Sequence, residues 1–219
     1  MELYSYLRSS AAYRVRIALN LKNVDYTIVP VHLVRGGGEQ LTPAHRQLHP
    51  GALVPVLIDD AAGGRVVLTQ SLAIIEYLEE TRAQPALLPQ APAARAYVRA
   101  LALSIACDIY PINNLRVLRY LKLELGVSDP AKDAWHRHWC IQGLVAIERM
   151  LVGHAYASDF CHGSTPTLAD CALVPQVFNA QHSNCDLTAM PRVMRIYSNC
   201  LEIDAFARAA PAAQAGAET

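Results

Sequence analysis

The chain changes character near residue 85, and this change constrains its fold more than any other feature. Residues 1–80 alternate between strand-like and helix-like segments, whereas the sequence after about residue 90 carries helical patterns alone. Strands are expected at 2–7, 26–31, 53–59 and 65–69, and helices at 10–22 and 71–81. The order β-α-β, then a loop or short helix, then a β-β hairpin and a helix predicts an α/β domain over residues 1–82.

A second, all-helical domain is predicted over residues 92–219. The proline-rich segment 82–94 is typical of a stiff linker. Helical patterns follow at roughly 93–124, 130–152, 167–182 and 191–208, and the small, polar tail is expected to fray. Pro111 should kink the first of these helices. Thr167 and Asp170 have capping-box spacing, which we interpret as structural.

Charge and cysteine usage exclude several classes of function. The formal net charge is zero and the pI is about 7.1, so neither nucleic acid nor an anionic membrane is an expected partner. No apolar run is long enough to span a membrane and no leader pattern heads the chain, so the cytoplasm is the expected location. The six cysteines lack metal-ligand spacing and suit small buried side chains in a reducing compartment. His136 and His138, two residues apart, would point to different helix faces, and no metal site is predicted.

The run RSSAAYRVRIAL contains two hydroxyls where the first strand passes into the first helix. Ser9 and Ser10 stand at the helix start, with Arg8 before them and Arg14 and Arg16 after them. A serine in this position is most often a plain helix cap, which would satisfy a free backbone amide. The same place can hold an anion or a thiolate, because helix N-termini present unpaired amides and a positive dipole end.

Pro55, between Val54 and Val56, is awkward for a central strand because it cannot donate to the ladder. A trans proline on an edge strand is the commoner outcome. A cis bond at the start of the strand would instead expose the backbone of Val54 to a ligand. The earlier stretch RGGGEQ lacks the spacing of a phosphate-binding loop and is interpreted as a flexible turn.

The chain resembles the glutathione transferases, and within them the zeta class of maleylacetoacetate and maleylpyruvate isomerases. The segments that carry the resemblance are LYSYLRSSAAYRVRIALNLKNVDY, LVPVLIDD, TQSLAIIEYLEETR, CDIYPINNLRVL, PTLADCALVPQVFNA and CDLTAMP. They run through nearly the whole sequence. The resemblance implies a thioredoxin-like domain followed by the helical domain of this family, a homodimer formed through the first domain and the first long helix, and glutathione as cofactor.

The resemblance also implies a set of glutathione-binding residues. Ser9 would face the sulfur with Ser10 beside it, and the family cysteine that normally follows is Ala11 here. Glutathione's own sulfur and the serines would then carry the reaction. The implied contacts are Ser9, Ser10, Ala11, Gln40, Val54, Pro55, Gln70, Ser71 and Asn114. Val54 before a cis Pro55 would pair with the cysteinyl backbone, and Gln70 and Ser71 would take the γ-glutamyl carboxylate.

The substrate implied by the resemblance is a small dicarboxylate. Arg8 would act as a catalytic residue with the two serines, since an arginine fork pairs with carboxylates. Tyr110, Asn114 and Arg116 lie on either side of the kink at Pro111 and would bind the substrate in the cleft between the domains. Some relatives use a further arginine where this chain has Gln181 and His182, and His182 is expected to be a surface side chain.

The predicted activity is a glutathione-dependent cis–trans isomerisation of a maleyl keto-acid. Two alternatives remain from sequence: a zeta-class transferase that conjugates or dehalogenates small electrophiles, and a non-catalytic glutathione-binding module. The sequence does not distinguish maleylpyruvate from maleylacetoacetate as the natural substrate.

Overall fold

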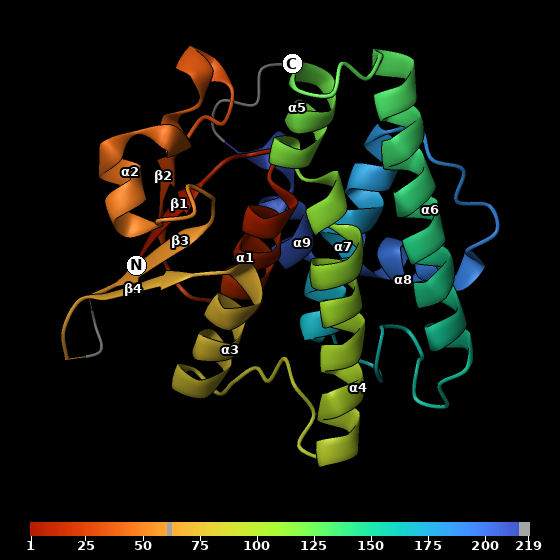
Figure 1. Cartoon of the computed structure of the whole chain (residues 1–219). Helices are drawn as coiled ribbons and strands as arrows, with labels where there is room; N and C mark the ends of the chain where they lie inside the picture. The colour runs from red at the N-terminus through yellow and green to blue at the C-terminus, as the bar shows by residue number, and fades with distance from the viewer. Residues whose placement is uncertain (61–62, 215–219) are drawn as a thin grey trace. The chain divides into compact units, whose positions relative to one another are not determined.

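A computed structural model of the chain describes residues 1–60 and 63–214 (Figure 1). They divide into two compact units. The first unit contains Met1–Leu87 together with residues 202–214, and the second contains Leu88–Leu201. The division between the two units at Leu87 and Leu88 lies close to the change of character near residue 85.

The first unit has the predicted β-α-β, β-β-α order. Its elements before the linker are β1 (Glu2–Ser5), α1 (Ser10–Leu21), β2 (Thr27–Pro30), α2 (Pro43–Leu48), β3 (Val56–Asp59), β4 (Val66–Thr69) and α3 (Ser71–Thr81). Short 3₁₀ turns at Arg35–Gly37 and Glu39–Leu41 precede α2. Thr42 caps α2 by accepting a hydrogen bond from the His45 amide, and a proline at the first helical position favours the start there.

The four strands form one mixed sheet in the order β2-β1-β3-β4. β1 pairs with β2 in parallel, as a strand–helix–strand crossover requires, and β1–β3 and β3–β4 are antiparallel. Leu3 lies opposite Ile28 on one side and opposite Leu57 on the other. The predicted hairpin of the third and fourth strands is confirmed; residues 61–62 of its turn lie outside the described residues.

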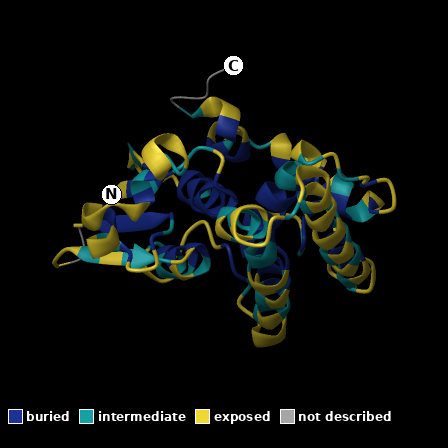
Figure 2. Cartoon of the chain, turned by 45° about the horizontal axis from the view of Figure 1, so that its top comes forward, coloured by how far each residue is buried: buried dark blue, intermediate teal, exposed yellow. Residues whose placement is uncertain are grey.

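Helix α1 is buried along nearly its whole length, as the dark blue ribbon of Figure 2 shows. It contacts α3 and also the C-terminal helix α9 (Asp204–Ala209). The apolar positions of α9 that meet this surface are Ala205, Phe206 and Ala209, all buried. A helix covered on several sides must bury its polar residues too, which is why two arginines of α1 are enclosed.

Two predictions for the C-terminal part differ from the structure. A single helix over 191–208 is wrong: α8 (Pro191–Leu201) ends, and α9 starts at Asp204 after a short break. Residues 202–214 then belong to the first unit rather than to one helical domain over 92–219, because the apolar face of α9 is buried on α1. The expectation that the tail frays falls largely on residues 215–219, which lie outside the described residues.

All the regular secondary structure described in the second unit is helical. Its helices are α4 (Pro92–Leu103), α5 (Leu115–Leu123), α6 (Asp129–Val152), α7 (Leu168–His182) and α8. Helix α7 lies at the centre and contacts α4, α6 and α8. Among the residues described, no helix is long and apolar enough to cross a membrane.

The predicted interruption at Pro111 is confirmed. Helix α4 widens into a π-helical stretch, Ser104–Ile109, in which the Tyr110 amide donates to the Ile105 carbonyl at 3.0 Å. A 3₁₀ turn at Pro111–Asn113 follows, and α5 starts afresh with Asn114 as its cap. Gly143 of α6 permits this path, because a Cβ there would collide with the side chain of Ile109.

Candidate active site

Ser9 is the N-terminal cap of α1. Its hydroxyl oxygen accepts a hydrogen bond from the Ala12 amide at 3.2 Å, and its own amide donates to the Tyr6 carbonyl at 3.0 Å. A hydroxyl has one hydrogen and two lone pairs, so an oxygen that already accepts from the helix still has its hydrogen to donate. The capping role and the thiolate-binding role are therefore compatible in one serine.

The neighbours of Ser9 complete the N-terminal end of α1. Ser10 and Ala11 are the first two residues of the helix and are buried. The first-turn amides of an α-helix have no partner within the helix, and they carry its positive dipole end. Arg8, the residue before the cap, is exposed. The serines predicted from sequence thus lie where helix geometry favours an anion, and no cysteine lies among them.

Val54 and Pro55 lie just ahead of β3. The bond between them is cis, so the commoner trans outcome is wrong here and the bond implied by the family resemblance is confirmed. Ladder pairing starts at Val56, opposite Tyr4 and Thr69, which places Val54 outside the sheet ladder. The buried His45 of α2 fixes the approach to this bond, with its Nε2 at 2.9 Å from the Leu53 carbonyl oxygen.

Gln70 and Ser71 form the start of α3. Gln70 has φ of 69°, and Ser71 is the buried first residue of the helix. The guanidinium of Arg14, itself 1% exposed, donates from Nη1 to the Ser71 hydroxyl oxygen at 3.3 Å. This contact connects α1 with the N-terminal end of α3. Because the Ser71 oxygen accepts from a cation, its hydroxyl hydrogen is directed to another acceptor.

Arg14 is a residue whose role the sequence interpretation missed. It had no assigned function, yet it lies behind the predicted carboxylate-binding serine. The sequence contained a sign that Arg14 is buried. Arg14 is followed by the apolar residues Val15 and Ile17, and the helix carries small side chains on its other faces. Such a sequence offers little solvated surface to a charged side chain.

Gln40 supplies the clearest test of fit for glutathione. The side chain is buried, and its Nε2 donates to the Leu33 carbonyl at 3.4 Å. Its Oε1 is buried with no hydrogen-bond partner among the described residues. A buried unpaired amide oxygen is costly unless a ligand or water donates to it, and a peptide cofactor carries such N–H donors. Gly38 is required beside it, since a Cβ there would lie 2.6 Å from the Gln40 side chain.

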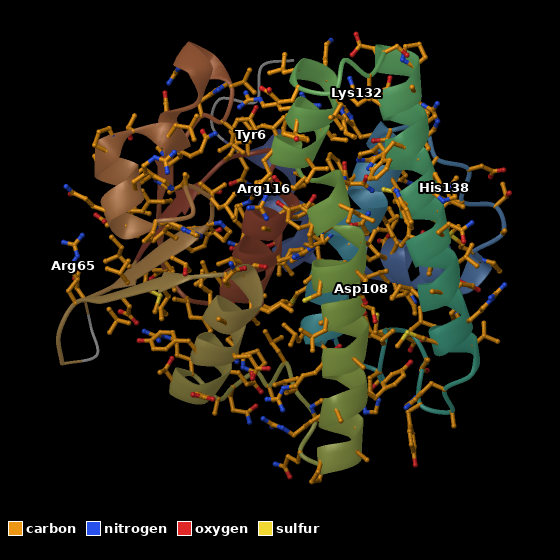
Figure 3. The ribbon with its side chains drawn as sticks, in the orientation of Figure 1. Tyr6, Arg65, Asp108, Arg116, Lys132 and His138 are labelled. Atoms are coloured by element: carbon orange, nitrogen blue, oxygen red, sulfur yellow. The ribbon has the colours of Figure 1, made fainter. Side chains whose placement is uncertain are left out.

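In the second unit, Tyr110, Asn114 and Arg116 come together at the start of α5. Asn114 donates from Nδ2 to the Tyr110 hydroxyl oxygen at 3.1 Å and accepts from the Arg116 amide at 3.2 Å through Oδ1. The side chain of Arg116 is exposed on α5, where Figure 3 labels it. The interruption at Pro111 creates this group, because it allows a new helix with a polar cap to begin here.

The other polar side chains considered from sequence lie on other helical segments of the second unit. Gln181 and His182 are exposed in the last turn of α7, and the ring of His182 lies parallel to that of Phe178. Cys107 is exposed, contrary to the prediction that the cysteines are buried; its position in the π-helical stretch could not be read from the sequence. Within residues 1–60 and 63–214, no group of three or more His, Cys, Asp or Glu side chains forms a metal site.

Comparison with known proteins places these features in a family. The sequence profile described as "Glutathione S-transferase, N-terminal domain" matches residues 3–86. A probable maleylacetoacetate isomerase of Vibrio cholerae is 49% identical over 95% of this chain and 94% of its own length. A maleylpyruvate isomerase of a Ralstonia species is 47% identical over 98% of both chains.

Solved structures agree with the sequence relatives. The holo structure of a maleyl pyruvate isomerase, described as a bacterial zeta-class glutathione transferase, covers both chains completely with a TM-score of 0.94 and 46% identity. A maleylacetoacetate isomerase from Methylobacterium extorquens with bound malonate and glutathione has the same TM-score and coverage at 39% identity. The chain, a thioredoxin-like unit joined to a helical unit, therefore belongs to the zeta-class glutathione transferases, the family of the maleylacetoacetate and maleylpyruvate isomerases.

Proposed function

We propose that this protein is a glutathione-dependent cis–trans isomerase that converts a maleyl keto-acid, maleylpyruvate or maleylacetoacetate, into its fumaryl isomer. Relatives of nearly full length carry both of these activities in their names, and solved relatives hold glutathione. The single structural observation that carries the proposal is the position of Ser9, whose hydroxyl caps α1 and keeps a hydrogen to donate at the helix mouth.

Glutathione is assigned to the first unit. The Ser9 hydroxyl and the amides at the start of α1 would hold its sulfur, and the backbone of Val54 would pair with its central peptide. The Gln40 Oε1 would accept one of its N–H groups. The Ser71 hydroxyl, supported from behind by Arg14, would donate to its γ-glutamyl carboxylate. The remaining predicted contacts are Ser10, Ala11, Pro55, Gln70 and Asn114.

The residues of this chain position glutathione and stabilise the negative charge on its sulfur. When bound, glutathione supplies a thiol that adds reversibly to the alkene and so permits rotation about the former double bond. A free thiol of this type has a pKa of about 8.5 and is mostly neutral at pH 7. A hydrogen bond from Ser9 and the dipole of α1 favour the ionised sulfur, and each unit by which its pKa falls corresponds to about 1.4 kcal/mol.

The substrate carboxylates are assigned to arginines. Arg8 in the first unit and Arg116 in the second are exposed, and their guanidinium groups suit bidentate pairing with carboxylates. Tyr110 and Asn114 are hydrogen-bonded to each other and supply polar contacts next to Arg116. Donors at these positions would also stabilise the enolate charge that develops on the substrate.

The test follows the absorbance of maleylpyruvate or maleylacetoacetate with and without glutathione. Turnover should require glutathione without consuming it, and Ser9→Ala should slow turnover by about 10- to 100-fold, since a hydrogen bond to a charged group contributes about 1.5–3 kcal/mol. Equal rates with and without glutathione would contradict the mechanism. Stoichiometric loss of glutathione would instead indicate a conjugating transferase.

A matched control separates capping from catalysis. Ser128 caps α6 in the same way as Ser9 caps α1, with its hydroxyl accepting from the Ala131 amide at 3.4 Å, and it is not assigned to any ligand. Ser128→Ala should cost about 1 kcal/mol of stability, as removal of a helix cap usually does, and should leave turnover unchanged. Ser9→Ala that behaves like Ser128→Ala would reduce Ser9 to a plain cap.

Two further proposals accompany this function. The protein is proposed to be a homodimer, formed through the first unit and α4, and light scattering after size exclusion measures its mass. A cytoplasmic location is proposed because glutathione maintains reduced thiols in that compartment and six free cysteines suit it. Fractionation of cells that express the protein tests the location.

A further inference from the structure

Arg16 is a buried cation in the middle of α1. It is 0% exposed, and its guanidinium donates to oxygens that carry no charge. Nε donates to the Ala209 carbonyl at 2.9 Å, and Nη2 donates to the Leu7 carbonyl at 3.0 Å. Nη1 donates to the Ser5 hydroxyl at 3.1 Å and to the Tyr6 carbonyl at 3.5 Å. Each of these hydrogen bonds fixes an oxygen of the polypeptide.

Three of these oxygens belong to the segment that leads into Ser9. Ser5 ends β1, and the chain then turns through Leu7 and Arg8 between Tyr6 and Ser9. The Tyr6 carbonyl also accepts from the Ser9 amide at 3.0 Å, so Arg16 and Ser9 share one acceptor. Tyr6 is labelled in Figure 3 at this turn. Arg16 thus determines where the chain turns from the sheet into the helix mouth.

The fourth oxygen belongs to α9. Residues 202–214 return to the first unit after the whole second unit has been formed, and α9 packs on α1. Arg16 holds the Ala209 carbonyl of α9. Asn20, one turn further along α1, holds the Ala205 carbonyl with its Nδ2 at 2.9 Å. Of these two attachments of α9, only the one through Arg16 reaches the turn before Ser9.

Arg16 also acts on the site through its positive charge. Burial lowers the pKa of its guanidinium to about 10, which still leaves it protonated at neutral pH. Arg16 and the Ser9 amide donate to the same carbonyl, that of Tyr6, so the positive charge lies near Ser9. This charge favours an anion at the N-terminus of α1. Lysine could not reproduce this arrangement, because a single ammonium lacks the planar fork that reaches several carbonyls at once.

We propose that Arg16 is a positioning residue for the thiol site: it holds the turn from Tyr6 to Ser9 through the Tyr6 and Leu7 carbonyls and anchors this turn to helix α9. This inference rests on the proposed function and extends it to two parts of the chain without ligand contacts, Arg16 and α9. It implies that α9, the last α-helix in the described part of the chain, supports the first active-site loop.

The experiment compares Arg16→Met and Arg16→Lys with Asn20→Ala. Asn20→Ala is the matched control, because it removes the hydrogen bond from α1 to the Ala205 carbonyl of α9, together with the acceptor of the Tyr26 hydroxyl, without touching the turn. Hydrogen exchange of the Ser9 amide in the ligand-free protein is the first measurement. Exchange should rise at least tenfold in both arginine variants and stay near the wild-type rate in Asn20→Ala.

The ultraviolet absorbance of the thiolate, titrated with pH in the glutathione complex, is the second measurement. The pKa of the bound thiol should rise by about one unit in Arg16→Met, which is a tenfold loss of thiolate preference. Unchanged exchange and unchanged thiol pKa in both arginine variants would overturn the inference, as would equal effects in Asn20→Ala. If Arg16→Met does not fold, Arg16→Lys and Asn20→Ala still decide the comparison. A wild-type complex whose thiol ionises as in free glutathione would refute the proposed function, while the exchange result would still test Arg16.

Discussion

Replacement of Asp170 by alanine should be among the most damaging single changes in the second unit. Asp170 is 0% exposed and accepts from four donors: the Cys161 amide at 2.9 Å, the Thr167 amide and hydroxyl at 2.8 Å each, and the Cys200 thiol at 3.9 Å. The alanine variant leaves two buried backbone N–H groups without an acceptor. Each such group costs about 1–3 kcal/mol, so the loss from these two is about 2–6 kcal/mol.

An opposing effect moderates this loss. Burial raises the pKa of the Asp170 carboxyl, which means that its ionised form is held in the core at a cost that the alanine variant removes. We therefore expect a net destabilisation of about 4 kcal/mol, within the range for a broken buried network. Thr167→Ala should cost only about 1 kcal/mol, since it removes a cap but leaves the carboxylate to accept from both amides.

Urea unfolding followed by tryptophan fluorescence measures this effect in the right unit, because both tryptophans, Trp135 and Trp139, lie in α6. Asp186 provides the matched control. It accepts from the amide and hydroxyl of Thr188 in the same pattern but on the exposed surface, so Asp186→Ala should change stability by less than about 0.5 kcal/mol. An Asp170→Ala protein within about 1 kcal/mol of wild type would refute the reasoning from buried donors.

Three other predictions concern the first unit. Lys22→Met should destabilise it by about 3 kcal/mol in urea unfolding, because the buried ammonium pairs with Glu79 at 2.7 Å and its removal takes the cation away from that carboxylate, which still accepts from the Leu87 amide. Burial is the main cause that lowers the pKa of His49 in the folded protein, so the unfolded chain binds a proton at this residue more readily. The free energy of unfolding should therefore fall as the pH falls through about 6.5 towards the lower pKa of the folded state, and His49→Gln should flatten this dependence. Arg14→Met should weaken glutathione binding about tenfold by calorimetry, through loss of the Ser71 contact, while an unchanged dissociation constant would contradict that role.

The order of elements, and the polar residues that stand at helix starts, could be predicted from the sequence alone. Strand composition and the helical spacing of apolar residues are local properties, so the β-α-β, β-β-α order of the first unit was predictable. Ser9, Ser71 and Asn114 each precede or begin a helix, and helix termini are the main local signal for an anion site. Pro111 could be identified as an interruption because proline lacks an amide hydrogen.

Which charges are buried, and which distant segments they hold, became apparent from the packing of the folded chain. Arg14 and Arg16 look alike in the run RVRI, yet one supports Ser71 and the other connects the Tyr6 turn to α9, almost two hundred residues later in the sequence. The break between α8 and α9 and the return of residues 202–214 to the first unit were also missed. The physical reason is that periodicity reports which face of a helix is apolar, whereas packing decides which partner covers that face and how an enclosed charge is satisfied.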